Sequence, residues 1–536
     1  MQPSLLSPED IQANLTAGVW SEETMLDCYR RYAREQPTAL ACRDAADTYS
    51  WSELDAITDR LAASLVSMGL ERDSRALVQM LSSSREVVLR IALKKAGIIG
   101  AFAPMQWRRR ELEYVRERID PALVVMSPAR METEDRAWLE ATLKDGSIQQ
   151  SVDLDDGGGD TWVDWSAMLD GPAGSDPSVQ ISEREFRFDE ISLLTMSSGT
   201  SGLAKLCEWP EAAQVLMGAV LAERMDVTDA DDIGIFAPMT GAAGLVVWMI
   251  SASVPCACTF PPSYRGPDLL DCAEKLKLTA ATTVPVILAR LVEESLESRD
   301  LSHLRFIRIG TGAPDMGMAR DFEERTGCRV VVASGSMECT GFGHADVRED
   351  ASVRLDGSVG RPLRTGQLRI EDEHGNELPP GTSGELKARG PYGSSGYWMD
   401  PAETAKVWKD GWYSTGDIGV IDDSGRLTLM GRLKFVINRS GLKILPVEVE
   451  LALSADPEVV ECAVVAGPDR AYGEVPIAFI QMREGSVMED QSLSDRLREA
   501  GFPEYKIPVR FIAIDALPRI SDNKIDRQAL MRLAGE

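Results

Sequence analysis

The chain has 536 residues, of which 44% are hydrophobic, and its 57 basic against 85 acidic side chains give a formal net charge of −28. This length exceeds one ordinary core, so two or more domains are expected. The acidic balance excludes a nucleic-acid-binding protein, because neutralising phosphates requires clustered lysine and arginine, and the hydrophobic content excludes overall disorder.

The N-terminus and the thiols predict a cytoplasmic protein. The opening residues, MQPSLLSPEDIQANL, lack a basic start followed by an apolar run, so no secretory signal is predicted. The most apolar stretch, 244–260, is too short for a membrane span and contains Pro255, so a buried helix and strand are predicted there. The nine cysteines lack paired metal-ligand spacing and are expected to be reduced.

The first part of the chain alternates strand-like and helix-like segments. Residues 74–81 and 121–127 have the composition of short buried strands, and residues 84–99 have the apolar spacing of a helix. The alternation returns in three later segments: 277–295, 304–314 and 329–336. This pattern predicts an α/β fold with a largely parallel, doubly wound sheet.

The texture of the sequence changes after Arg348. Residues 357–390 combine short strand-like runs with glycine- and proline-rich turns, which predicts a small β-subdomain. From Lys434 onward, a helix-like run and two strand-like runs predict a compact α+β module of about a hundred residues. The predicted domains are a large N-terminal domain of residues 1–433, with its β-subdomain at about 346–433, and a small C-terminal domain of residues 434–536.

A loop rich in glycine and hydroxyl side chains, SSGTSG, follows the predicted strand DEISLLTM and precedes Lys205. Glycines allow successive N–H groups to point into one concavity, and hydroxyls add donors, so the loop has the chemistry of a phosphate cradle with a positive charge at its rim. It is not a Walker A loop, because Leu203 and Ala204 separate Gly202 from the lysine. Taken alone, the stretch fits an ordinary surface turn equally well.

Four further stretches carry polar residues in a meaningful order. Glu338 follows the strand-like run RVVVA, where a carboxylate at the carboxyl end of a strand can hold Mg²⁺. Asp417, in a Thr-Gly-Asp turn, is suited to accept hydrogen bonds from the hydroxyls of a ribose. Two basic stretches complete the set: MGRLKFVINRSGLK, with Arg432, Lys434 and Gly441, and LPRISDNKIDR, with Lys524. Each has a structural alternative, but this order and spacing are not expected by chance.

The order of these motifs resembles the adenylate-forming superfamily of acyl- and aryl-CoA synthetases, luciferases and nonribosomal adenylation domains, and is most similar to the synthetases. The resemblance runs from YSWSELDAITDRLAASLVSMG to NKIDR and includes GTGAP, GSVGRP and GELKARGPYGSSGY. It implies an ATP-dependent, AMP-forming ligase that joins a small carboxylic acid to a thiol. It also implies a hinge near Lys434 and a mobile C-terminal domain that alternates between two positions, with the active site between the domains.

The resemblance implies ATP, Mg²⁺ and CoA, or the phosphopantetheine thiol of a carrier protein in place of CoA, and neither nucleic acid nor a membrane span. Lys205, Glu338 and Lys524 would be catalytic, Glu338 also binding Mg²⁺ and Lys524 bridging the carboxylate and the α-phosphate. The nucleotide and CoA contacts would be Ser197, Ser198, Gly199, Thr200, Ser201 and Gly202 at the phosphates, Gly312, Ala313, Pro314, Ser334, Gly335, Ser336 and Met337 near the adenine and α-phosphate, Asp417 and Arg432 at the ribose, and Gly441 at the pantetheine tunnel.

Met337 departs from the family pattern. It stands where relatives usually carry a threonine whose hydroxyl contacts the α-phosphate. One interpretation is a weak adenylation half-reaction. The other is that Met337 packs under the acyl group and that Thr340 or a water replaces the missing donor.

The implied acyl pocket contains Thr240, Gly241, Gly310 and Met337. CoA synthetases often carry a histidine or aromatic residue at the position of Gly241, so glycine predicts space for a bulky, hydrophobic acid of the kind used in natural-product pathways. No carboxylate in 240–243 can pair with an α-ammonium, which disfavours an amino acid.

Three functions stay open beside an acyl-CoA synthetase. One is an enzyme specialised for forming the thioester from supplied acyl-AMP, which Met337 motivates. The second is a stand-alone adenylation enzyme that loads a carrier protein. The third, an inactive relative, is disfavoured by the presence of Lys524, Asp417 and Glu338.

Overall fold

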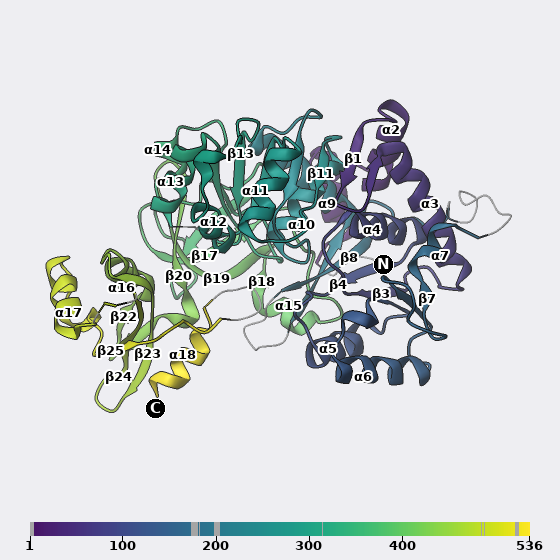
Figure 1. Cartoon of the computed structure of the whole chain (residues 1–536). Helices are drawn as coiled ribbons and strands as arrows, with labels where there is room; N and C mark the ends of the chain where they lie inside the picture. The colour runs from purple at the N-terminus through teal and green to yellow at the C-terminus, as the bar shows by residue number, and fades with distance from the viewer. Residues whose placement is uncertain are drawn as a thin grey trace. The chain divides into compact units, whose positions relative to one another are not determined.

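The structure is a computed structural model of the whole chain (Figure 1). It describes residues 5–172, 181, 183–197, 204–312, 315–483, 485–486, 488–519 and 525–535. The chain divides into two compact units: Met1–Leu368 with Ala388–Tyr413, and Arg369–Lys387 with Ser414–Glu536. The predicted hinge near Lys434 stays a prediction.

A seven-stranded sheet forms one layer of the first unit, in the order β7-β6-β5-β3-β4-β8-β9. Neighbouring strands are parallel, except that β9 runs antiparallel to β8. The strands are β3 (Arg75–Val78), β4 (Ile99–Phe102), β5 (Leu123–Met126), β6 (Gln150–Asp153), β7 (Val163–Asp164), β8 (Ile191–Ser197) and β9 (Lys205–Pro210). This confirms the strands predicted within 74–81 and 121–127.

Helices cover both faces of this sheet (Figure 1). Ala76 and Val78 of β3 pack into the core shared with α3 and α4, whereas Leu77 between them packs into the core of α5 and α6 on the opposite face. The helices around this sheet are α1 (Pro8–Thr16), α2 (Met25–Glu35), α3 (Trp51–Ser67), α4 (Ser84–Ala96), α5 (Arg109–Ile119), α6 (Thr133–Lys144) and α7 (Trp165–Leu169). The alternation along β3 is what a doubly wound sheet requires.

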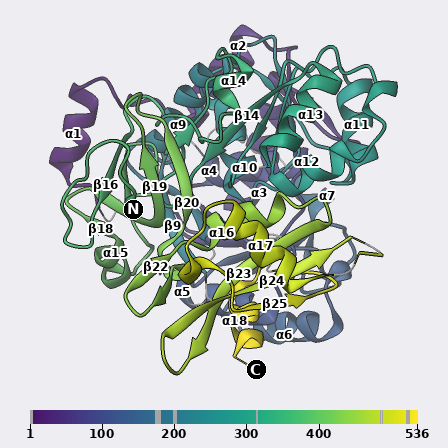
Figure 2. The same cartoon turned by 90° about the vertical axis from the view of Figure 1, so that its left-hand side faces the viewer.

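An eight-stranded sheet forms the second layer, in the order β15-β14-β13-β12-β10-β11-β1-β2, with antiparallel pairs only at its two ends. Its strands are β1 (Leu40–Arg43), β2 (Thr48–Ser50), β10 (Asp232–Ile235), β11 (Ala257–Thr259), β12 (Ala280–Thr283), β13 (Phe306–Ile309), β14 (Arg329–Ser334) and β15 (Gly343–His344). Helices α11, α12 and α13 lie together over one face (Figure 2). The helices associated with this layer are α9 (Glu211–Met225), α10 (Ala242–Trp248), α11 (Gly266–Lys275), α12 (Pro285–Val292), α13 (Met316–Thr326) and α14 (Ala351–Arg354). Helix α15 (Pro401–Val407) instead lies beside β9 of the first layer, where its Glu403 pairs with Lys205.

Two local predictions can be compared with these elements. The apolar stretch 244–260 forms most of α10 and then β11, as predicted, and no helix of the described residues is long and apolar enough to cross a bilayer. The helix predicted over 84–99 is too long at its end. Gly97 adopts the left-handed conformation (φ 70°) that ends α4, and Ile99 already begins β4.

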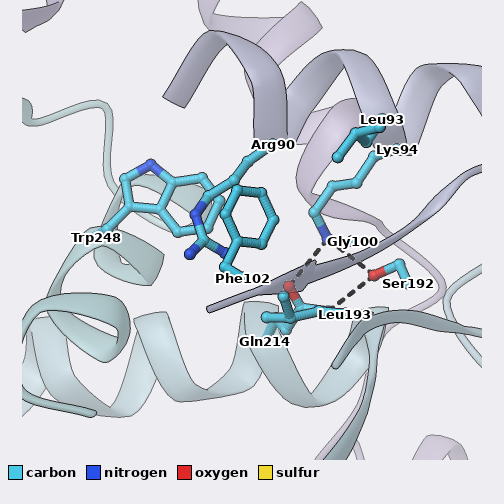
Figure 3. Close-up of a pocket in the computed structure, with 9 residues that line it drawn as sticks. All are labelled: Arg90, Leu93, Lys94, Gly100, Phe102, Ser192, Leu193, Gln214 and Trp248. Atoms are coloured by element: carbon cyan, nitrogen blue, oxygen red, sulfur yellow. Dashed lines mark hydrogen bonds between the residues drawn. The ribbon is translucent and has the colours of Figure 1, made fainter. Parts of the chain in front are cut away.

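A buried ionic network ties α4 to β8 and α9. Lys94 donates hydrogen bonds of 2.9 Å to Ser192 of β8 and to Gln214 of α9 (Figure 3). It also forms an ion pair with Glu211. Because Ser192 lies on the strand that ends at Ser197, this network fixes the base of the predicted phosphate loop.

Arg90, one turn before Lys94, packs against Phe102 of β4 and against Trp248 at the end of α10. Its guanidinium carbon lies 3.6 Å from the ring centre of Phe102 and 5.6 Å from that of Trp248, in α10 (Figure 3). The cavity beside these side chains has a volume of about 10 Å³, room for about one water molecule, so it is not a substrate pocket.

The second unit holds the predicted α+β module. Five strands pair in the order β22-β21-β24-β23, with β25 beside β24. A separate small sheet has the order β16-β17-β19-β18, with β20 beside β19. Strand β18 (Trp408–Lys409) belongs to the first unit, and β16 (Gln367–Glu371), β17 (Gly384–Arg389) and β19 (Trp412–Ile421) begin or end in it. The elements wholly within the second unit are β20 (Leu427–Arg432), β21 (Ile437–Arg439), β22 (Leu442–Ile444), α16 (Pro446–Ser454), β23 (Val459–Asp469), β24 (Gly473–Met482), α17 (Asp490–Glu499), β25 (Arg510–Ala513) and α18 (Arg527–Ala534).

Candidate active site

The β8–β9 hairpin places Ser197 and Lys205 opposite each other. Strand β8 is buried along its whole length and ends at Ser197, β9 begins at Lys205, and the two residues are register partners. The predicted loop residues Ser198, Gly199, Thr200, Ser201 and Gly202 lie outside the described part of the chain. The hairpin therefore fixes both ends of the predicted phosphate loop and carries its lysine on a strand.

Two groups from α15 and the segment before it hold Lys205. Its Nζ lies 3.1 Å from Oε2 of Glu403 and 4.8 Å from the ring centre of Tyr397. The carboxylate offsets the charge of the ammonium, and the ring face attracts it by a cation–π interaction. The lysine is thereby held beside Tyr397.

Glu338 contacts the same tyrosine through its hydroxyl. The Glu338 residue is 7% exposed, and its Oε1 accepts a hydrogen bond of 3.0 Å from the Tyr397 hydroxyl. Burial raises the pKa of Tyr397 far above its usual value and the charge of Glu338 raises it further, so the phenol stays a neutral donor. Lys205, Tyr397 and Glu338 form one cluster, which we call the Tyr397 cluster. It joins the hairpin to the turn after β14.

The turn after β14 presents Glu338. Ser334 ends the strand, the Ser336 N–H donates to the Cys339 carbonyl at 3.2 Å, and the Ser336 hydroxyl accepts from the Cys339 N–H at 3.2 Å. A Cβ on Gly335 would lie 2.7 Å from the backbone nitrogen of Gly341. The tight turn therefore requires glycine at this position.

Met337 is a core residue. It is 6% exposed and belongs to the same hydrophobic core as Leu245 and Val246 of α10. Thr340, the alternative donor, is also buried and its hydroxyl donates to the Tyr392 carbonyl at 3.4 Å. The burial of Met337 favours the interpretation in which its side chain packs in the core, whereas the bond from Thr340 to the Tyr392 carbonyl counts against Thr340 as the replacement donor.

The predicted pocket residues lie around the start of α10. Gly241 directly precedes the helix, beside the half-buried Thr240, and a Cβ on it would meet only the Pro238 carbonyl oxygen, at 3.5 Å. Gly310 follows β13, and a Cβ there would lie 3.1 Å from the Cβ of Ala243. The two segments are thus neighbours, and position 241 has room for a side chain. Of the residues predicted to border the adenine, Gly312 is described, and Ala313 and Pro314 lie outside the described residues.

In the second unit, strands β19 and β20 pair Asp417 with Arg432. The two residues are register partners, and Oδ1 of Asp417 lies 2.6 Å from Nε of Arg432. Asp417 is buried and the Arg432 side chain is half exposed. The ion pair therefore holds the Asp417 carboxylate and the half-exposed Arg432 guanidinium in a fixed orientation on this sheet.

The remaining predicted residues of the second unit lie on or near turns. Lys434 is in the 3₁₀ turn Leu433–Phe435, and its Nζ lies 4.7 Å from the Phe435 ring centre. Gly441 is in the β21–β22 turn with a left-handed φ of 91°, and its N–H donates to the Asn438 side chain at 2.8 Å. Lys524 lies outside the described residues.

Sequence comparison decides the family. The pattern of AMP-binding enzymes matches residues 29–398, and that of the AMP-binding enzyme C-terminal domain matches residues 448–524. The chain belongs to the AMP-binding enzyme family. The predicted membership of the adenylate-forming superfamily is thereby confirmed.

Relatives match this AMP-binding enzyme over nearly its full length. The pseudomonine synthase of Pseudomonas entomophila is 28% identical over 98% of this chain and 86% of its own. The 2-hydroxy-7-methoxy-5-methyl-1-naphthoate–CoA ligase of Streptomyces carzinostaticus is 28% identical over 98% and 96%. The crystal structure of ATP-bound MatB from Rhodopseudomonas palustris has a TM-score of 0.85 at 25% identity, over 95% of this chain and 99% of that one. The predicted fold class is confirmed by this match.

The surroundings of Glu338 in this AMP-binding enzyme fit a magnesium ion held partly by a nucleotide. No three Asp, Glu, His or Cys side chains gather into a metal site among the residues that the structure describes. Mg²⁺ usually takes one or two carboxylates and completes its shell with water and substrate phosphates. A single buried carboxylate near the β8–β9 hairpin, which flanks the predicted phosphate loop, meets that requirement.

The sequence did not predict Tyr397 of this cluster, nor Glu403, which pairs with its Lys205. Tyr397 ends the motif GELKARGPYGSSGY, so a signal for it was present. Glu403 lies in the first turn of α15, where an acidic residue has an ordinary structural explanation. Its contact with Lys205 joins residues about two hundred positions apart, which local sequence does not encode.

Proposed function

We propose that this AMP-binding enzyme is an acyl-CoA synthetase that activates a carboxylic acid as acyl-AMP and transfers the acyl group to the thiol of CoA. The observation that carries the proposal is the Tyr397 cluster. It sets a cation, Lys205, and a buried carboxylate, Glu338, beside the two ends of the predicted phosphate loop.

Activation overcomes a leaving-group problem. A thiol cannot displace oxide from a carboxylate, but it can displace AMP from an acyl-phosphate anhydride. A carboxylate oxygen attacks the α-phosphorus of ATP, the bond to the bridging β-phosphate oxygen breaks, and pyrophosphate leaves with the electron pair. Charge shifts among the phosphoryl oxygens during this step, so fixed donors and cations aimed at them lower the barrier.

The residues of the first unit divide this task. Lys205 and the loop after Ser197 would hold the β- and γ-phosphates. Glu338 would hold Mg²⁺, which supplies charge neutralisation at the phosphates when bound. The Tyr397 hydroxyl fixes the orientation of the Glu338 carboxylate. The loop around Gly312 would border the adenine.

The residues of the second unit would act in both half-reactions. Asp417 and Arg432 would bind the ribose, and Lys524 would bridge the carboxylate and the α-phosphate. Rotation at Lys434 would then withdraw Lys524 and bring the loop that contains Gly441 to the pantetheine thiol. One site can thus serve two reactions in sequence, with a conformational step between them.

CoA is the proposed acceptor, and a carrier protein is the second candidate. One relative is named as a CoA ligase, which favours CoA. The resemblance to nonribosomal adenylation domains keeps the carrier protein as the alternative. A bulky aromatic acid, of the kind named in the naphthoate–CoA ligase, agrees with a glycine at position 241, where no side chain takes up space and an added Cβ would meet only the Pro238 carbonyl oxygen. We therefore propose a role in natural-product biosynthesis.

Two assays separate the candidate functions. The first is ATP–pyrophosphate exchange over a library of carboxylic acids, and the second is thioester formation from synthetic acyl-AMP with CoA or a pantetheinylated carrier. Exchange together with a CoA ester supports the proposal, and transfer to the carrier alone identifies the second candidate. Thioester formation without exchange identifies the half-reaction enzyme that Met337 motivates. Inactivity in both assays contradicts all three.

Replacing Gly241 with tryptophan is expected to exclude bulky acids. The indole would occupy the space beside the start of α10, where a Cβ meets no atom closer than 3.5 Å. Loss of room for a few methylenes changes discrimination by about 1–3 kcal/mol, so exchange with bulky acids should fall about tenfold or more relative to acetate. Gly241→Ala is the matched control and should leave the ranking of acids unchanged. An unaltered ranking in folded Gly241→Trp would remove this residue from the pocket.

Replacing Met337 with threonine is expected to lower stability without accelerating adenylation. The change removes buried apolar volume and adds a hydroxyl to the core, at a cost of about 2–4 kcal/mol, whereas Met337→Leu should cost less than about 1.5 kcal/mol. Denaturant unfolding measures both variants. The two half-reactions are measured in parallel, and a gain of about tenfold in exchange relative to thioester formation would instead identify a missing donor to the α-phosphate.

A further inference from the structure

Arg308 is a buried cation that has no carboxylate partner among the described residues. It lies in β13 and is 5% exposed. Its Nε donates to Nε2 of His344 at 3.2 Å and its Nη1 donates to Oγ1 of Thr282 at 3.4 Å. A guanidinium has five N–H donors, so these two bonds leave most of its capacity unused within the described structure.

The histidine beside Arg308 is neutral and cannot balance the charge. Burial lowers the pKa of His344 well below its usual value, and the positive charge of Arg308 lowers it further. The Nδ1 of His344 lies 2.7 Å from the Ala345 carbonyl, so Nδ1 carries the proton and Nε2 accepts from Arg308. Burial lowers the pKa of Arg308 to about 10, which leaves it charged at neutral pH.

Other buried cations of the first unit have acidic partners. Arg90 pairs with Glu86 at 2.6 Å, and Arg354 pairs with Glu323 at 2.6 Å. A buried charge without a counterion costs several kcal/mol, and this chain has an excess of acidic residues from which a partner could have come. A bound anion beside Arg308 would offset this free-energy cost.

The guanidinium of Arg308 lies next to Gly310, one of the residues of the proposed acyl pocket. A Cβ on Gly310 would be 2.7 Å from Nη1 of Arg308 and 3.1 Å from the Cβ of Ala243, so glycine at this position makes room for the cation. Thr282, which accepts from Arg308, itself donates to the Ala243 carbonyl at 2.9 Å. Arg308 thus sits between the end of β13 and the start of α10, the two segments that carry the pocket residues.

We propose that Arg308 pairs with a second carboxylate of the acid, distinct from the one that is activated, so that the substrate is a dicarboxylic acid. This inference rests on the proposed function, in which Lys524 meets the carboxylate that reacts. A planar guanidinium with free N–H pairs matches a carboxylate in a two-point contact. The pocket would then discriminate by charge as well as by size.

The test compares each acid with its own half-ester. Benzene-1,3-, benzene-1,4- and naphthalene-2,6-dicarboxylate and their monomethyl esters are measured by pyrophosphate exchange and by stabilisation of the protein against heat. Wild type should favour a diacid over its half-ester. Arg308→Gln should lower kcat/KM for that diacid about thirtyfold or more and change the half-ester less than about threefold. Arg305→Gln, which removes a cation already paired with Asp231 at 2.9 Å, is the matched control.

Arg308→Met distinguishes a ligand-binding residue from a structural one. Removing an unpaired buried charge should leave the midpoint of thermal unfolding equal to or above that of wild type, whereas a structural arginine would lower it. Diacid stabilisation that is equal in wild type and Arg308→Gln overturns the assignment, with or without exchange. Exchange with half-esters alone overturns the assignment and leaves the synthetase function standing. Stabilisation by diacids that needs Arg308, without exchange by any acid, supports the assignment and counts against the proposed function.

Discussion

Replacing Glu338 with glutamine is expected to slow ATP–pyrophosphate exchange by a factor of about 10²–10³, because one charged group aimed at the reacting phosphates typically contributes that much. The carboxylate is buried and already oriented by the Tyr397 hydroxyl, so glutamine should fit the same space without the negative charge. The Mg²⁺ concentration that gives half-maximal exchange should rise in parallel. Exchange rates measured across a Mg²⁺ titration test both statements.

Two further variants separate charge from packing at this position. Tyr397→Phe keeps the carboxylate and removes its 3.0 Å hydrogen bond, so about a tenfold loss is expected. Glu223→Gln, at an exposed carboxylate of α9, should leave both exchange and the Mg²⁺ requirement unchanged. If Glu338→Gln retained the wild-type Mg²⁺ dependence in a folded protein, Glu338 would not be the metal ligand.

The strands and helices of the first unit were largely predictable, because apolar periodicity is a local property. Residues 74–81 and 121–127 form β3 and β5 as predicted. The helix predicted over 84–99 was wrong at its C-terminal end. Ile98 and Ile99 continue the apolar pattern, but the helix already ends at Gly97. Short apolar runs do not by themselves distinguish the end of a helix from a buried strand.

The candidate site was predictable where a motif marked it and unpredictable where only packing did. Lys205 and Glu338 stand in recognisable stretches, and Tyr397 joins them through a phenol. Arg308 gave no signal, because one arginine in FIRI has the composition of an ordinary strand. Its meaning comes from the absence of an acidic partner among the described residues around it, which depends on three-dimensional neighbours.

Replacing Lys524 with alanine is expected to abolish exchange and to spare thioester formation. In the proposed mechanism the ammonium meets both the attacking carboxylate and the α-phosphate, so its loss should cost about 10³ in the adenylation rate. After rotation at Lys434 the same lysine would be away from the acyl-AMP, so the rate from supplied acyl-AMP and CoA should stay within about threefold of wild type. Both rates are measured on the same preparation.

The contrast between the two half-reactions carries this prediction. Lys506→Ala is the matched control, since that lysine also lies in the second unit and pairs with Glu448, and it should change neither rate. A folded Lys524→Ala variant that lost both rates equally would mean that the lysine serves both steps, and the two-conformation mechanism would then be wrong. A lysine that stayed beside the α-phosphate would also stabilise the departing AMP, so its removal would slow thioester formation as well. Loss of exchange alone would therefore mean that Lys524 leaves the site between the two steps.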